Sequence, residues 1–252
     1  MNDRTAAPAA TARNHPIWDP PFTSRHPWLL PGGLLVFLAG LTAGVQAGGP
    51  LVSLDRHIRA VVLARAATPG WHWLIEYRLS PARVLVNLGD TRIAVPVLLL
   101  AAVALSMRRH SPRPLAAAGI AVVLLLVTVI PGKIIIARPS PGLGPVAPGG
   151  WGAFPSGHTT TGSVGYVLAA LLIAGSAGRA RRAAGAATMV LSFLIGIALV
   201  WRDFHWFTDV LAGWALAALI VWAALRLTSR PARPPEPHPG REPAPQQSAT
   251  SG

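Results

Sequence analysis

Long apolar runs, each bounded by short polar clusters, make up most of the chain between residues 28 and 228. A helix needs about 20 mostly apolar residues to cross the hydrocarbon core of a bilayer. Runs of roughly that length without a charged residue predict spans at 28–47, 114–132, 159–178, 183–201 and 210–225. A further span is expected to begin near Val84 and to continue through the apolar run 93–107, with Asp90 and Arg92 close to the membrane interface.

The segments outside these runs are of two kinds. Residues 55–83 mix charged and apolar positions, and their apolar residues recur at helical spacing, which is typical of an amphipathic helix on a membrane surface. Residues 1–27 are polar and residues 229–252 are rich in Pro, so we expect flexible tails there. The predicted fold is all-α: a six-span transmembrane helical bundle over residues 28–228, with an amphipathic interfacial helix between the first two spans.

Composition supports a membrane protein and excludes several classes of site. Hydrophobic residues make up 52% of the chain and charged residues 12%, whereas a soluble domain carries about 25% charged residues. The absence of cysteine excludes disulfides, thiolate zinc sites and cysteine nucleophiles. The net charge of +13 lies in short basic clusters between apolar runs, a pattern typical of membrane topology, so we expect no nucleic-acid partner.

The basic clusters also predict an orientation. With the N-terminus in the cytoplasm, the short loops after the second and fourth spans are cytoplasmic, and each carries three Arg residues. The long outer segment 49–83 also contains basic residues, so these two short loops decide the orientation. We therefore expect both termini in the cytoplasm, together with Arg108, Arg109, Arg113, Arg179, Arg181 and Arg182.

Three polar clusters stand at span ends, and the predicted topology places all three on the outer side. Polar groups at membrane depth are costly and usually functional. One residue is also unusual by type, because Lys133 is the single lysine among 22 basic residues. The clusters are Lys133 with Arg138, then Pro155-Ser156-Gly157-His158, then Arg202 with His205 and Asp209.

The third cluster has the spacing of a nucleophile and its orienting acid. His205 and Asp209 are four residues apart, so a helix places them on one face. A carboxylate there fixes the imidazole tautomer and leaves the other ring nitrogen as a nucleophile or base. The alternative is a His and an Asp that happen to lie at the start of a span.

The other two clusters suit an anion. Ser156 and Gly157 would lie at a helix N-terminus, where free N–H groups favour negative charge, and His158 could protonate a leaving oxygen. Lys133 and Arg138 add two positive charges. The alternatives are an ordinary helix cap beside an interfacial His, and cations that extend to the interface from a span end.

Together these residues suit phosphoryl transfer, in which cations hold the phosphate oxygens, one His attacks and the other protonates the leaving group. The expected intermediate is a phosphohistidine. Because no cluster of Asp and Glu is available to hold Mg²⁺, we expect a metal-independent reaction without a cofactor.

At these residues the sequence resembles the type 2 phosphatidic acid phosphatase family, whose superfamily also contains the vanadium haloperoxidases. The family pattern is Lys-x6-Arg-Pro, then Pro-Ser-Gly-His, then Ser-Arg-x5-His-x3-Asp. The second part is intact at 155–158, and the His-x3-Asp half of the third is intact at His205 and Asp209. The resemblance implies six spans with the motifs on one side.

The resemblance also implies a role for each residue. His205 would be the nucleophile, Asp209 would orient it, and His158 would be the acid and later the base. The phosphate would be held by Lys133, Arg138, Ser156, Gly157 and Arg202.

Two departures from the family pattern concern the arginines. Seven residues after Lys133 the family has Arg, but this chain has Ser140, and the nearest Arg is Arg138. In the third motif Leu199 stands where the family has Arg, and Arg202 lies three residues before His205 instead. Both arginine roles are therefore shifted along the chain.

Four further residues near the motifs have simpler interpretations. Asp55 and Asp90 are interpreted as helix caps or as partners of nearby Arg residues. Trp151 and Phe154 are interpreted either as an apolar wall beside the site or as anchors at the membrane interface.

The sequence thus predicts a membrane lipid phosphatase at the outer face of a bacterial plasma membrane. Substrates implied by the family are phosphatidic acid, phosphatidylglycerol phosphate and prenyl pyrophosphates such as undecaprenyl pyrophosphate. The displaced arginines keep a second reading open, a weak or inactive relative that binds lipids or anions in the membrane. A haloperoxidase is disfavoured because those relatives are larger and soluble. Substrate choice and oligomeric state stay open.

Overall fold

The computed structural model describes residues 26–68, 70–71, 80–175 and 178–229, and these residues form helices and connecting loops without a strand. The predicted tails at 1–27 and 229–252 lie almost entirely outside the described residues. The helices are α1 (Leu29–Gln46), α2 (Pro50–Ala66), α4 (Pro81–Gly89), α5 (Thr91–Arg108), α6 (Arg113–Ile136), α7 (Gly157–Ala174), α8 (Gly178–Trp201) and α9 (Phe207–Thr228).

Within the described part of the chain, five helices are long and apolar enough to cross a membrane: α1, α5, α6, α8 and α9. Each of these helices contains one of the predicted apolar runs, so the structure has five candidate spans at the expected places. Residues 159–174 of the remaining run belong to α7 (Gly157–Ala174), and the polar residues His158, Thr159, Thr160 and Thr161 at the start of this helix lower its hydropathy. The count of six spans therefore stays a prediction.

The second predicted span is not one continuous helix, so this prediction is wrong. We expected one helix to begin near Val84 and pass Asp90, but the chain breaks there into α4 and α5. Asp90 has an extended backbone with ψ 137°, and its Oδ1 accepts the Arg92 N–H at 2.8 Å. Asp90 is thus the N-cap of α5, as its interpretation as a helix cap predicted.

Helix α7 lies at the centre of the bundle and packs against α5, α8 and α9. Leu168 and Leu172 are fully buried in its apolar half. Gly165 lies where α7 contacts α5, and an added Cβ there would lie only 2.8 Å from the carbonyl oxygen of Ala94. Small residues on α7 therefore let neighbouring backbones approach closely enough to surround its N-terminal turn.

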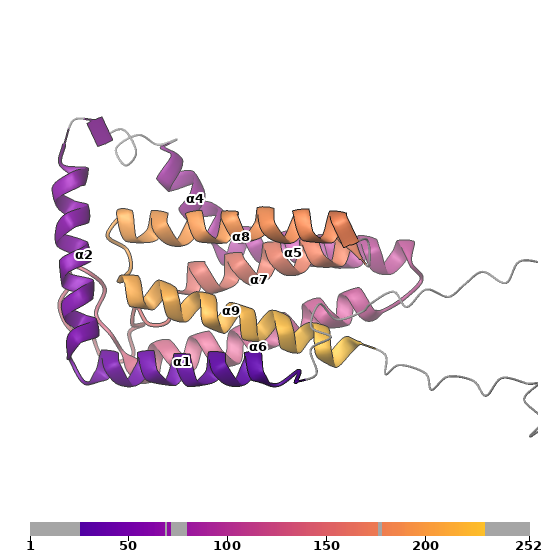
Figure 1. The fold of residues 1–252 in the computed structure, drawn as a ribbon, viewed down its shortest axis with the longest axis horizontal. Coiled ribbons are helices and arrows are strands. Elements are labelled where there is room, and N and C mark those ends of the chain that lie inside the picture. The colour runs from indigo at the N-terminus through magenta and orange to yellow at the C-terminus, as the bar shows by residue number, and fades with distance from the viewer. Residues whose placement is uncertain (1–25, 69, 72–79, 176–177, 230–252) are drawn as a thin grey trace, which may run out of the picture.

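Helix α2 runs across one end of the bundle, roughly perpendicular to the long helices (Figure 1). Asp55 and Arg59, four residues apart on α2, face that end. Arg59 donates two hydrogen bonds to Asp203 in the α8–α9 loop, each at 2.7 Å, and Asp55 pairs with Arg138 at 2.6 Å. Two ion pairs thus attach α2 to the bundle, while its position at a membrane interface stays a prediction.

The opposite end of the bundle carries the basic clusters. Helix α1 begins and α9 ends at this far end, and the α5–α6 loop and the start of α8 lie there too (Figure 1). The connection from α5 to α6 contains Arg108, Arg109 and Arg113, and the start of α8 contains Arg179. The arginines that predicted the orientation therefore lie far from the end that α2 covers.

Candidate active site

The predicted polar clusters meet in one cavity at the end of the bundle near α2. The cavity has a volume of about 730 Å³ and lies between the N-terminal turns of α5 and α7, the C-terminal half of α6, and the loops that precede α7 and α9. Of the residues predicted for the site, the cavity brings together Lys133, Gly157, His158 and His205. Other polar residues that line it are Asp90, Thr91, Arg92, Ser140 and Thr161.

Lys133 lies in the last turn of α6, and the following loop folds back over it. Its Nζ donates to the carbonyl oxygens of Gly152 at 2.9 Å and Ala153 at 3.5 Å, while the Gly152 N–H donates to the Lys133 carbonyl at 3.1 Å. An added Cβ at Gly152 would lie 2.6 Å from the backbone nitrogen of Arg138, so only glycine allows the two backbone segments to approach this closely. The loop therefore holds the ammonium group at the wall of the cavity.

The N-terminus of α7 adjoins Lys133. Ser156 is fully buried, and its Oγ accepts hydrogen bonds from the Thr159 backbone N–H at 3.4 Å and from Thr159 Oγ1 at 2.9 Å. This side chain therefore caps the helix instead of lining the cavity. Gly157 does line the cavity, and its absent side chain leaves room for Lys133, whose Cε would lie 3.4 Å from an added Cβ. The first N–H groups of a helix have no partner within it, so those of Gly157 and His158 can bind an anion here.

His205 and Asp209 form the predicted pair. His205 Nδ1 and Asp209 Oδ2 are 3.4 Å apart, and Asp209 is fully buried whereas the His205 side chain is 10% exposed. The Trp206 N–H donates to the same oxygen of Asp209 at 3.1 Å, which fixes the carboxylate at the N-terminus of α9. With Nδ1 directed to Asp209, Nε2 is the ring nitrogen left for a substrate.

His158 occupies a more open position in the same cavity. Its side chain is 38% exposed, and its Nε2 lies 3.8 Å from Asp90 Oδ2. The two histidines therefore have different surroundings: His205 is held against a buried carboxylate, whereas His158 is accessible and faces a solvated one. This difference in exposure suits His205 to act as a nucleophile held in one orientation and His158 to act as an accessible proton donor.

Arg138 lies outside the cavity, in a buried network of charges. Its guanidinium donates to Asp55 at 2.6 Å, to Asp209 at 2.5 Å and to Thr208 Oγ1 at 2.7 Å, and Thr208 in turn bonds to Asp55. The ring of Trp206 covers the guanidinium, with 5.2 Å from Cζ to the ring centroid. These contacts commit Arg138 to two carboxylates, and they hold Asp209 through Oδ1, the oxygen that does not face His205. Asp55 thus pairs with an arginine 83 residues away and not with one near it in the sequence.

Arg202 also lies outside the cavity. It follows the end of α8 and stacks on Phe204, with its Cζ 5.1 Å from the ring centroid. Partial burial and the nearby charge of Arg83 lower the pKa of Arg202. The structure therefore does not bring either displaced arginine to the cavity that contains Lys133 and the two histidines.

Sequence reasoning overlooked two parts of this site. Arg92 and Ser140 line the cavity, and Thr208 joins the network behind Asp209. Arg92 offered one signal, because it stands at the membrane end of a predicted span, and Ser140 offered another, because it occupies the position where the family has Arg. Thr208 offered none.

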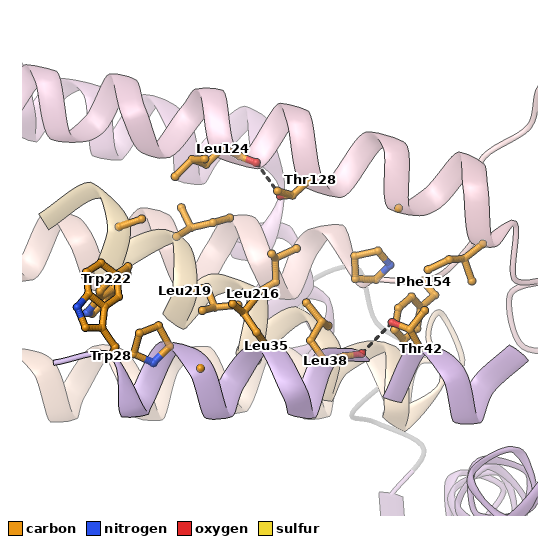
Figure 2. A pocket seen from close by; sticks show the side chains of 17 residues that line it. Trp28, Leu35, Leu38, Thr42, Leu124, Thr128, Phe154, Leu216, Leu219 and Trp222 are labelled. Atoms are coloured by element: carbon orange, nitrogen blue, oxygen red, sulfur yellow. Dashed lines mark hydrogen bonds between the residues drawn. The ribbon is translucent and has the colours of Figure 1, made fainter. Parts of the chain in front are cut away.

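A second cavity of about 680 Å³ lies on the opposite side of α6, between α1 and α9. Figure 2 shows Trp28 and Trp222 at one end of it and Phe154 and Thr42 at the other. None of the residues placed along it is ionisable, so it lacks the groups that phosphoryl transfer needs. The predicted apolar walls are thus divided: Trp151 lines the first cavity and Phe154 the second.

Comparisons with known proteins show similarities in fold and in sequence. The fold is similar to the crystal structure of a transmembrane PAP2-type phosphatidylglycerolphosphate phosphatase from Bacillus subtilis, with a TM-score of 0.63 and 22% sequence identity over 78% of this chain and 94% of that one. No curated protein matches the sequence significantly. The model of the PAP2 superfamily matches residues 114–233, the stretch from α6 to just beyond α9 that contains Lys133, His158 and His205. The C-terminal half of the membrane region is therefore similar to the PAP2 superfamily.

Proposed function

We propose that the chain is a membrane lipid phosphatase that works through a phosphohistidine intermediate. The observation that carries this proposal is the single cavity in which Lys133, His158 and His205 meet beside the N-terminus of α7. The match of residues 114–233 to the PAP2 superfamily and the similarity in fold to a membrane PAP2-type phosphatase support the same reaction class.

In the first step His205 Nε2 attacks the phosphorus atom, a nitrogen–phosphorus bond forms, and the bond from phosphorus to the leaving oxygen breaks. His158 gives its proton to that oxygen, so the lipid alcohol or lipid phosphate leaves in a protonated form. In the second step water attacks the phosphorus atom, His158 takes the water proton, and the nitrogen–phosphorus bond breaks, which releases inorganic phosphate and restores His205. Asp209 stabilises the positive charge that develops on His205.

The phosphate oxygens are held by the Lys133 ammonium and by the N–H groups of Gly157 and His158. Each donor aimed at the developing charge contributes about 3 kcal/mol to the stabilisation of the transition state. Ser156 contributes indirectly, because its side chain caps the helix whose N-terminus binds the anion. Arg138 acts as a positioning residue that fixes Asp209, and Arg202 has no direct role.

The shape of the cavity supports a lipid substrate. Below the polar groups its walls continue along α5 and α6 as apolar side chains, including Val95, Leu125 and Val129. An acyl or prenyl chain in this part of the cavity keeps the phosphate group at the polar end. Phosphatidic acid, phosphatidylglycerol phosphate and undecaprenyl pyrophosphate all meet this requirement.

We further propose that the active site faces the outside of a bacterial plasma membrane and that both termini are cytoplasmic. Three arginines of the α5–α6 loop region and the arginines at the start of α8 lie at the end of the bundle opposite the cavity. Basic residues are enriched on the cytoplasmic side of membrane proteins, which supports this orientation.

The test is phosphate release by detergent-purified protein in the presence of EDTA, with the three lipids as substrates. We expect release from at least one lipid, abolished by His205→Ala and unchanged by His57→Ala, a matched change at an exposed histidine of α2. Radiolabelled substrate should leave an acid-labile label on the protein, as a phosphohistidine does.

The alternative is an inactive relative that binds lipid phosphates, and the position of both displaced arginines outside the cavity favours it. Binding of the three lipids without release of phosphate would support this alternative. Release that survives His205→Ala would contradict the proposed nucleophile, and release that EDTA abolishes would contradict a metal-independent reaction.

A further inference from the structure

Several positively charged side chains lie near the active-site cavity, but few of them line it. Arg59 and Arg138 each pair with carboxylates, at 2.7 Å and 2.6 Å, and neither lines the cavity. Lys133 lines it, but two loop carbonyls already accept hydrogen bonds from its ammonium group. A phosphate that enters the cavity with two negative charges therefore needs another donor.

Arg92 is the remaining cation among the described residues that line the cavity. It lies in the first turn of α5, whereas Lys133 lies in the last turn of α6. Its backbone is fixed, because the Arg92 N–H donates to Asp90 Oδ1 at 2.8 Å. Its side chain is exposed, and within the described part of the chain no hydrogen bond or ion pair engages its guanidinium.

We propose that Arg92 binds the phosphate group of the substrate and supplies the second positive charge of the site. This inference rests on the proposed function and adds to it a phosphate-binding residue outside all three motifs. A guanidinium can bond two phosphate oxygens at once, which a lysine ammonium cannot do in the same planar geometry. Helix α5 and helix α6 then hold the phosphate from two sides, with His205 and His158 between them.

The experiment compares Arg92→Gln with Arg83→Gln in the purified protein, using the preferred lipid. Arg83 is an exposed arginine of α4 that does not line the cavity, so its variant is a matched control. Neither change removes a backbone N–H, so the cap of α5 by Asp90 is kept. We expect Arg92→Gln to lower kcat/KM about a hundredfold, Arg92→Lys to recover part of this loss, and Arg83→Gln to leave kcat/KM unchanged.

A second readout separates phosphate binding from a structural role. Inorganic phosphate should inhibit the wild-type enzyme by occupying the cavity, and Arg92→Gln should weaken this inhibition while the thermal unfolding temperature stays the same. Ser140 lines the same cavity, so Ser140→Arg offers a guanidinium from another wall and should restore part of the activity of Arg92→Gln.

The outcomes distinguish this inference from the proposed function. A wild-type enzyme without phosphatase activity would count against the proposed function itself. An active wild type in which Arg92→Gln behaves like Arg83→Gln would overturn the role of Arg92 alone. Reduced turnover with unchanged inhibition by phosphate would also overturn it, since a residue that binds the phosphate must affect both.

Discussion

At the scale of single residues, Asp209 connects the catalytic cavity to the buried charges behind it. Its Oδ2 faces His205 and the Trp206 N–H, while its Oδ1 accepts from Arg138. Arg138 is shared with Asp55, so one guanidinium serves two carboxylates that are both fully buried. His205, the proposed nucleophile, thus faces a carboxylate that is held by residues from α2, from the loop after α6 and from α9.

The first prediction concerns Arg138. Arg138→Ala leaves two buried carboxylates without their cation, and breaking a buried pair in this way costs about 3–5 kcal/mol. We expect a large fall in the unfolding temperature of the detergent-solubilised protein along with the loss of activity. A role in phosphate binding would instead predict a raised KM in a protein of unchanged stability.

The second prediction separates the two histidines by leaving group. A lipid alkoxide needs a proton to leave, whereas p-nitrophenolate does not, so His158→Ala should slow lipid hydrolysis by about 10²–10⁴-fold and affect p-nitrophenyl phosphate far less. His205→Ala should abolish both activities because it removes the nucleophile. Equal losses on both substrates for His158→Ala would argue against its role as the acid.

At the scale of elements, the ends of helices build the site. Helix α6 presents Lys133 in its last turn, α7 presents Gly157 and His158 in its first, and α5 begins at the wall that carries Arg92. The loop between α6 and α7 folds back on the first of these ends, because the Gly152 N–H donates to the Lys133 carbonyl in α6 and the Ala153 N–H to the Arg138 carbonyl just after it. Small residues in this loop are therefore part of the site.

The third prediction tests this loop. Gly152→Ala places a Cβ 2.6 Å from the backbone nitrogen of Arg138, so the loop must move. The hydrogen bonds from Lys133 to the carbonyls of residues 152 and 153 must then change. We expect a large loss of phosphatase activity while the helical circular dichroism signal is retained. Gly144→Ala in the same loop is the matched control, because a Cβ there meets nothing within 4 Å. Equal activity of the two variants would show that the position of Lys133 does not depend on this contact.

At the scale of the whole molecule, the cavity and the basic clusters lie at opposite ends of the bundle (Figure 1). The chain contains no cysteine, so a single introduced cysteine reports its own side of the membrane. Ala147 in the loop near the cavity and Ala180 in the first turn of α8 are both exposed, which makes them a matched pair.

The fourth prediction uses this pair in intact cells. A maleimide that cannot cross membranes should label Ala147→Cys directly and should label Ala180→Cys only after the cells are permeabilised. This result would support an active site on the outer face, since basic residues at the start of α8 then stay in the cytoplasm. The reverse pattern would place the cavity in the cytoplasm and contradict the proposed orientation.

The sequence by itself determined which stretches are apolar helices and which residue types the site contains. Hydropathy is summed over a local stretch, so the runs at 28–47, 114–132, 183–201 and 210–225 predicted α1, α6, α8 and α9 closely. The His205 and Asp209 spacing was equally local, because four residues of helix bring the two side chains to one face.

Only the tertiary structure decided which charges meet. Asp55 and Arg138 are separated by 83 residues, and no local pattern shows that they share a buried network with Asp209. The same holds for Arg92, which the break at Asp90 and the packing of α5 beside α6 and α7 bring to the cavity. A charged side chain takes its partner from whatever group the fold brings within a few ångströms, so spacing along the chain identified the histidines and their carboxylate but not the cations.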